Sequence, residues 1–205
     1  TSRLIPQETL TDLIETALKQ DTLVFLDEDF LEFVNNEKQL SMVSKISKYP
    51  NLFILRSFTK IFGLTGLRIG YGIANSEIID VLLCAKIPWN VNCLAQPAAI
   101  AALKDNEHLS GTLELIKKET SYLAKELENI KQLSFSAPDA NFFFINTKKT
   151  GQTAAEIKTK MLKQGLLIRD CTSFKGLDKY YIRVAVKMHR ENVRLIEALK
   201  NSLKS

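Results

Sequence analysis

The stretch that decides the fold is LRSFTKIFGLTGLRIGYG, residues 55–72. It continues the apolar run NLFIL, and a cluster of polar residues follows directly. The members of this cluster that can hold a ligand are Ser57, Thr59, Lys60 and Arg68. In open α/β sheets, ligands bind beyond the carboxyl ends of the strands. The stretch therefore predicts a strand that carries two hydroxyls, an amine and a guanidinium to a ligand site.

A second strand with a polar end precedes this one in the chain. The run TLVFL (22–26) is typical of a strand that is buried on both faces, and Asp27 follows it directly. RIGYGIA (68–74) predicts a third strand, whose glycines allow close approach of the backbone. If the first two strands are neighbours in one sheet, Asp27 and Lys60 share a crevice at its carboxyl edge.

Helical patterns alternate with these strands. Apolar spacing predicts a helix after Pro6 over 8–20, a second over 39–49, and a third over 76–87 with Ser76 as its cap. Strands that alternate with helices favour an α/β fold with a mostly parallel sheet.

After about residue 105 the pattern changes to a smaller α+β unit. A long amphipathic helix is expected over 107–131, and a short strand pair within 135–147. A helix that ends at Gly165 follows. The remaining elements are two strands and a closing helix, at 166–170, 180–186 and 191–204. We therefore expect two domains, one of residues 1–105 and one of residues 106–205.

The composition argues against several classes of function. The 205 residues are 45% apolar and 25% charged, and no apolar run reaches the roughly 20 residues of a membrane span. The net charge is +5, but the lysines are interleaved with glutamates, so we expect no nucleic-acid partner. His108 and His189 are far apart and the cysteines form no C-x-x-C pair, so we expect reduced thiols and no metal site.

The polar cluster suits a phosphorylated aldehyde. A lysine amine forms a Schiff base with an aldehyde, while hydroxyls and a guanidinium can hold a phosphate. A carboxylate at a neighbouring strand end, such as that of Asp27, can pair with a pyridinium nitrogen. These groups together are the protein complement of pyridoxal phosphate. Taken singly, a lysine after a strand is usually a surface residue and an aspartate there usually belongs to a turn, so spacing alone leaves those alternatives open.

The segment SFTKIFGLTGLRIGYG (57–72) resembles the lysine motif of the class I/II, fold-type I pyridoxal-phosphate enzymes. The resemblance extends over nearly the whole chain. It implies part of the mostly parallel large-domain sheet plus a small C-terminal α+β domain. It also implies that Lys60 is the Schiff-base lysine and that Asp27, in LDEDFLEF, bonds the ring nitrogen. The phosphate-binding positions of the motif correspond to Ser57, Thr59 and Arg68.

Within this family the chain is most similar to the branch that contains histidinol-phosphate aminotransferase and threonine-phosphate decarboxylase. Phe30 stands where many aminotransferases have a tyrosine, and the segments 87–96 and 167–186 resemble the decarboxylase forms. The resemblance therefore implies decarboxylation of L-threonine O-3-phosphate to (R)-1-amino-2-propanol O-2-phosphate, the linker unit of cobalamin. Histidinol-phosphate aminotransferase, or a related class I/II aminotransferase, is the alternative, since the same residues serve both reactions.

Two arginines lie in predicted strands of the second unit. An arginine in a buried strand is costly without an anion, although two surface arginines at a sheet edge are the plainer interpretation of the residues alone. The resemblance implies that Arg183 binds the substrate carboxylate and that Arg169 binds the substrate phosphate. We therefore expect a small phosphorylated amino acid as the substrate.

The start of the chain, TSRLIPQETL, resembles a point well inside the family's enzymes. We therefore interpret the chain as the C-terminal portion of a longer protein. A partial sheet would expose a strand edge and an apolar face, which predicts poor solubility or association for this piece alone. The resemblance implies a cytoplasmic homodimer, and a fragment without catalytic activity is the remaining alternative.

Overall fold

The computed structural model describes residues 2–204, which form two compact units. The first unit comprises Leu4–Thr112, and the second comprises the residues from Leu113 on, together with Ser2 and Arg3. Each unit has its own sheet and its own apolar core, so the fold is mixed α/β. Within the described residues, no helix is both long enough and apolar enough to cross a bilayer.

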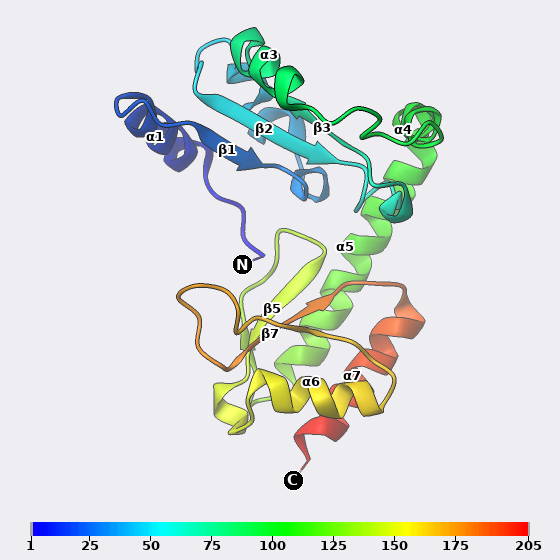
Figure 1. The fold of residues 1–205 in the computed structure, drawn as a ribbon. Coiled ribbons are helices and arrows are strands. Elements are labelled where there is room, and N and C mark those ends of the chain that lie inside the picture. Colours follow the sequence, from blue (N-terminus) through cyan, green and yellow to red (C-terminus); the bar gives the residue numbers. More distant parts are fainter. Residues whose placement is uncertain (1, 205) are drawn as a thin grey trace. The chain divides into compact units, whose positions relative to one another are not determined.

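The sheet of the first unit has three strands in the order β1-β2-β3 (Figure 1). They are β1 (Val24–Asp27), β2 (Leu52–Ser57) and β3 (Gly70–Ile73). β1 and β2 are parallel neighbours, with Asp27 opposite Leu55. β3 is antiparallel to β2, because the chain turns back between them. The shared crevice predicted for Asp27 and Lys60 requires this parallel pairing of β1 with β2.

Helix α1 and the segment 42–49 pack on one face of this sheet. The helices of the first unit are α1 (Gln7–Leu18), α2 (Glu37–Leu40), α3 (Ser76–Ala85), α4 (Ala95–Lys104) and the start of α5 (Asn106–Glu128). Pro6 precedes α1, as the sequence predicted. Ile14 of α1 is fully buried in one cluster with Leu52 and Ile54 of β2. This cluster buries one face of β2, the strand that precedes Lys60.

The helix expected over 39–49 is wrong. The chain instead forms α2 and a separate 3₁₀ turn, Met42–Lys45, with Ser41 between them in extended backbone. The Ser41 hydroxyl accepts a hydrogen bond from the Val43 N–H at 3.1 Å and donates one to the Glu28 carboxylate at 2.8 Å. A serine that bonds its neighbouring backbone competes with helical hydrogen bonding, and here it starts the new turn.

The cap expected for α3 is also wrong by one residue. Asn75 precedes the helix in extended backbone, and its side-chain oxygen accepts a hydrogen bond from the Ile78 N–H at 3.0 Å. Ser76 is the first helical residue instead. Both residue types can cap a helix, so sequence alone did not separate them.

The other face of the first sheet is open, which corrects the expected burial of both faces of β1. Leu52 and Ile54 are fully buried on the packed face, whereas Phe25 is 64% exposed. Phe25 stacks on Phe53, its partner across the strands, with ring centroids 5.0 Å apart. Because side chains alternate along a strand, Asp27 belongs to the same open face as Phe25.

The second unit is an antiparallel sheet with helices packed on one face (Figure 1). Its strands run in the order β4-β5-β7-β6. They are β4 (Ser134–Phe135), β5 (Phe142–Asn146), β6 (Arg169–Asp170) and β7 (Tyr181–Ala185). The covering helices are the rest of α5, α6 (Ala154–Lys163) and α7 (His189–Leu203). The expected strand over 166–170 is thus shorter than predicted, and the other predicted elements of this unit are present.

The core of the second unit joins all three helices to the central strands. Leu123 of α5, Ile157 of α6 and Leu199 of α7 are fully buried in one cluster with Phe143 of β5. α6 ends just before Gly165, whose φ of 73° places it in the left-handed region. A glycine adopts this backbone without the strain of a Cβ, so the predicted stop is confirmed.

We expect Gly70→Ala to destabilise the first unit by about 1–3 kcal/mol. A Cβ at Gly70 would lie 2.8 Å from the carbonyl oxygen of Arg56, a backbone atom that moves only if β2 shifts. Gly66→Ala is the control, because a Cβ there meets nothing within 4 Å. Urea unfolding measures both variants, and equal losses of stability would contradict the close approach of β3 to β2.

Candidate active site at the carboxyl edge of the first sheet

The end of β2 passes into a tightly bonded loop that carries the predicted lysine. The Ser57 hydroxyl oxygen accepts a hydrogen bond from the Thr59 N–H at 3.1 Å. The Thr65 hydroxyl donates to the Thr59 carbonyl at 3.0 Å, and the Gly63 N–H donates to the Lys60 carbonyl at 3.1 Å. These bonds hold the loop beside the strand end, so the two hydroxyls and the amine lie on one short segment.

Arg68 closes this loop in an uncommon backbone conformation. Its φ is 51°, in the left-handed region, which costs a residue with a Cβ roughly 1 kcal/mol or more. One guanidinium nitrogen, Nη1, donates to the Thr65 carbonyl at 2.9 Å. Strained backbone of this kind persists where the surrounding structure imposes it, and it is frequent at ligand-binding sites. Arg68 is therefore a candidate for ligand binding on structural grounds as well as by its motif.

Asp27 lies at the end of the neighbouring strand. Asp27 lies opposite Leu55 in the sheet. Ser57 is two residues further along β2 than Leu55. The Asp27 Oδ1 accepts a hydrogen bond from the Asp29 N–H at 2.9 Å, which forms a turn at the strand end. Because β1 and β2 are parallel, the carboxylate and the hydroxyl reach the same edge of the sheet. The structure thus brings Asp27 to the same edge of the sheet as the loop that carries Lys60.

The direct partner of Lys60 is a residue that sequence reasoning missed. The Lys60 Nζ lies 2.7 Å from Oδ2 of Asp29, and the Ser57 hydroxyl donates to the other carboxylate oxygen. The Phe30 ring centroid lies 5.1 Å from the same amine, within the range of a cation–π contact. Strand alternation continued past Asp27 would have placed Asp29 on the open face, and this was the available signal.

A buried charged cluster supports β2 from its packed face. Arg56 is only 9% exposed, and two of its guanidinium nitrogens contact Oε2 of Glu28, at 2.8 and 3.1 Å. Glu37 and Glu32 approach the third nitrogen, Glu32 at 3.7 Å. Glu28 also accepts a hydrogen bond from the Met42 N–H at 2.8 Å. The cluster therefore ties the strand that ends at the lysine loop to the turns beneath it.

This cluster holds more carboxylates than cations. Burial raises the pKa of Glu32 to about 7, and the nearby charge of Arg56 offsets only part of that effect. One Glu32 oxygen, Oε2, is buried and accepts no hydrogen bond from any residue that the structure describes. Glu32 is therefore half protonated close to neutral pH.

In the second unit, Arg169 and Arg183 lie directly opposite each other on β6 and β7. Neither is buried, which corrects the burial argument made from the sequence. The Arg183 guanidinium lies 4.7 Å from the Phe142 ring centroid, and Arg169 donates to the Ser173 hydroxyl at 3.2 Å. Like charges directly opposite across two strands destabilise a sheet unless an anion lies between them. The pair is thus suited to bind an anionic group.

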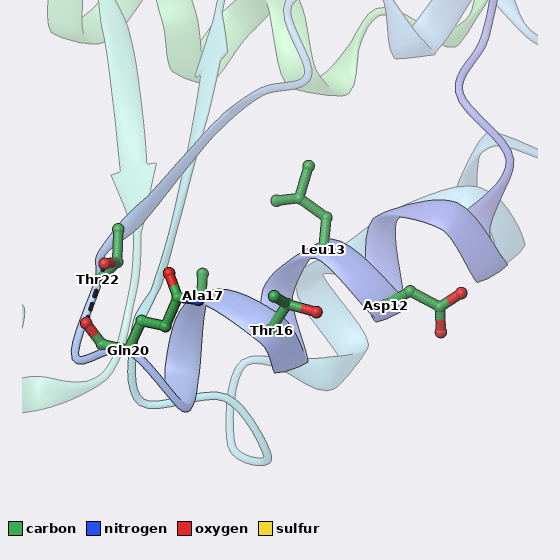
Figure 2. Close-up of a pocket in the computed structure, with 6 residues that line it drawn as sticks. All are labelled: Asp12, Leu13, Thr16, Ala17, Gln20 and Thr22. Carbon is green, nitrogen blue, oxygen red and sulfur yellow. Dashed lines mark hydrogen bonds between the residues drawn. The ribbon is translucent and has the colours of Figure 1, made fainter.

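A hollow of about 400 Å³ on the first unit does not coincide with these residues (Figure 2). It lies along α1 and the turn that follows, and it is lined by Asp12, Leu13, Thr16, Ala17, Gln20 and Thr22. None of the predicted site residues contributes to it. The described residues also hold no group of three or more histidine, cysteine or carboxylate side chains that is arranged to bind a metal.

The chemistry of the side chains at the carboxyl edge fits pyridoxal phosphate. Lys60 has 35% of its side chain exposed, so its amine is accessible to an aldehyde. Hydroxyl and guanidinium donors for a phosphate lie on the same segment of chain, at Ser57, Thr59 and Arg68. Asp27 is exposed at the end of the neighbouring strand and supplies a carboxylate for a ring nitrogen.

Comparison with known proteins matches nearly the whole chain to one family. The family model for aminotransferase class I and II matches residues 1–199. Histidinol-phosphate aminotransferase of Methanosphaera stadtmanae is 40% identical to this chain. The match covers 98% of this chain and 53% of that protein. The chain spans about half the length of the curated relatives it matches.

Two solved structures have the same fold. The crystal structure of histidinol-phosphate aminotransferase from Clostridium acetobutylicum is 34% identical, with a TM-score of 0.90 over 98% of this chain and 60% of that one. The crystal structure of L-threonine-O-3-phosphate decarboxylase from Porphyromonas gingivalis is 29% identical, with a TM-score of 0.85 over 100% of this chain and 61% of that one.

We expect Glu32→Gln to remove a pH dependence of stability. The native carboxyl has a pKa of about 7, against 4.5 for the ordinary group. Between these values the native state binds more protons than the unfolded state, so the free energy of unfolding falls as pH rises. This group should contribute a fall of about 1–3 kcal/mol across the interval.

Urea unfolding on either side of this pH interval measures the effect. The glutamine variant should show the flatter profile and the higher stability above the interval, while Glu77→Gln, at an exposed position, should resemble the wild type. A profile for Glu32→Gln as steep as that of the wild type would contradict the assignment.

Proposed function

This chain belongs to the aminotransferase class I and II family, whose enzymes depend on pyridoxal phosphate, and we propose that it supplies the lysine-bearing portion of such an enzyme. In this proposal residues 1–105 are the C-terminal part of the large cofactor-binding domain, and residues 106–205 are the small domain. The observation that carries the proposal is the loop at the carboxyl end of β2. An accessible amine stands there among phosphate donors, next to the strand that ends in a carboxylate.

The residues at this edge divide the work of holding the cofactor. Lys60 would hold the cofactor covalently, through its amine. The hydroxyls of Ser57 and Thr59 donate to the phosphate, and the Arg68 guanidinium adds charge-assisted hydrogen bonds. Asp27 accepts a hydrogen bond from the ring nitrogen and keeps that nitrogen protonated. When bound, the cofactor supplies an electron-accepting ring for bonds that break at the substrate α-carbon.

For the reaction we propose decarboxylation of L-threonine O-3-phosphate to (R)-1-amino-2-propanol O-2-phosphate, as a step towards cobalamin. Four features of the chain support it. Phe30 leaves the position beside Lys60 without a hydroxyl, and the segments 87–96 and 167–186 have the decarboxylase character. Arg169 and Arg183 stand opposite each other, and a substrate with both a phosphate and a carboxylate satisfies two cations.

In this reaction the chain orients the substrate and moves one proton. Arg183 anchors the substrate carboxylate, because a guanidinium matches a carboxylate with two parallel hydrogen bonds. Arg169 binds the phosphate. Carbon dioxide would leave from the anchored carboxylate, and Lys60, in its ammonium form, would donate a proton to the substrate α-carbon.

Histidinol-phosphate aminotransferase is the second candidate. The relative that is 40% identical carries that name, and so does the solved structure with a TM-score of 0.90. The same Lys60, Asp27 and Arg68 would serve it, because a transaminase also moves a proton at the α-carbon through its lysine. The pose of the substrate then decides which bond breaks. A small phosphorylated substrate is common to both candidates.

The assembly and location of the enzyme complete the proposal. We propose a cytoplasmic homodimer, in line with the family. The exposed Phe25 and the exposed edge at β1 fit a chain that is completed by further protein, so the 205 residues alone are a candidate for an inactive fragment.

The reaction is tested by supplying pyridoxal phosphate with L-threonine O-3-phosphate and measuring carbon dioxide. A second assay supplies histidinol phosphate with 2-oxoglutarate and measures glutamate. We expect carbon dioxide in the first assay and no glutamate in the second. The reverse result would establish the aminotransferase, and activity in neither assay would support the inactive fragment.

The roles of the residues are tested in the same assay. Lys60→Ala should abolish turnover, and Arg183→Met should lower kcat/KM by about 100-fold or more, because it removes a charge-assisted anchor. Lys48→Ala, which removes a lysine on the first unit outside the proposed site, is the matched control and should retain activity. Full activity in Lys60→Ala would refute both enzyme candidates.

A further inference from the structure

Asp29 occupies the donors that the proposed cofactor needs. Its two carboxylate oxygens take the Lys60 amine, at 2.7 Å, and the Ser57 hydroxyl. The carboxylate is only 13% exposed, against 35% for the lysine side chain, so the pair is partly shielded from water. A shielded ion pair is screened less than a pair on the open surface.

The position of this carboxylate conflicts with the ligand proposed for the site. A phosphate bound through Ser57 would meet the negative charge of Asp29, and like charges at close range repel. An amine that is held by a carboxylate must also leave it before it can bond to an aldehyde carbon. Asp29 therefore opposes cofactor capture on both counts, while it holds the amine and the hydroxyl at one carboxylate.

We propose that Asp29 is an internal counter-anion that holds Lys60 whenever the lysine is not linked to the cofactor, and that it competes with the cofactor for Lys60 and Ser57. The inference rests on the function proposed above. Asp29 is a positioning residue in this account, because it acts through Lys60 and not on the substrate. Its backbone N–H bonds to Asp27, so the same turn that places the counter-anion also orients the ring-nitrogen carboxylate.

The first test uses the chain without cofactor. Trace acetylation with acetic anhydride, followed by peptide mass spectrometry, measures how freely each lysine amine reacts. We expect Asp29→Asn to raise the acetylation of Lys60 by about 2–5-fold, the range expected from loss of a partly exposed ion pair. Asp29→Glu keeps a carboxylate and should restore most of the protection.

A matched pair elsewhere on the first unit provides the control. Lys48 lies 3.1 Å from Glu15, so Glu15→Gln should raise the acetylation of Lys48 and leave Lys60 unchanged. Asp29→Asn should leave Lys48 unchanged, which also reports that the unit remains folded. Unchanged acetylation of Lys60 in Asp29→Asn would overturn the proposal.

The second test measures cofactor capture. Borohydride reduction after titration with pyridoxal phosphate gives the concentration at which half of Lys60 carries the adduct, and this concentration should be lower in Asp29→Asn than in the wild type. An equal or higher value would overturn the role of Asp29 alone. Absence of an adduct on Lys60 in both proteins would instead contradict the proposed function.

Discussion

The parallel pairing of β1 with β2 is the constraint on which the rest of the site depends. It places the polar ends of both strands at one edge of the sheet, so that a carboxylate from Asp27 and the lysine loop from Ser57 to Lys60 share that edge. A shift of one residue in this register would turn one set of polar side chains to the packed face, where Leu52 and Ile54 are fully buried. The apolar packing of Leu52 and Ile54 therefore determines which polar side chains lie together at the carboxyl end of β2.

Two ion pairs at β2 differ in their exposure to water: the pair at Arg56 is buried, and the pair at Lys60 is partly exposed. On the packed face, Arg56 is held among three glutamates in a buried cluster that fixes the strand to the turns below it. Beyond the end of β2, Lys60 pairs with Asp29 at a partly exposed position, where we propose that a ligand replaces this partner. A buried pair is costly to break because it leaves a charge without compensation, whereas a pair at the edge can exchange.

Sequence reasoning identified the residues that stand at strand ends and missed those that depend on side-chain pairing. The strand-end positions of Lys60 and Asp27 were predicted from apolar runs followed by polar residues, the pattern of a ligand edge in an α/β sheet. Their roles toward the cofactor came from the family resemblance and stay predictions. Asp29 was missed because its pairing with Lys60 depends on the turn after β1, in which the Asp29 N–H donates to Asp27. The Arg56 cluster was missed because its carboxylates come from separate turns. The burial assumed for Arg183 was wrong because side chains alternate along a strand. Ile182 and Val184 face the core, so Arg183 between them lies on the opposite face of β7.

The central claim is that Lys60 is the residue that captures pyridoxal phosphate, and one measurement addresses it most directly. The chain is mixed with pyridoxal phosphate, reduced with borohydride, and digested for mass spectrometry. The account predicts one dominant adduct, on Lys60, because its amine and the Ser57 hydroxyl meet at the same carboxylate, that of Asp29. Adducts spread over the surface lysines, with Lys60 labelled no more than the others, would contradict it.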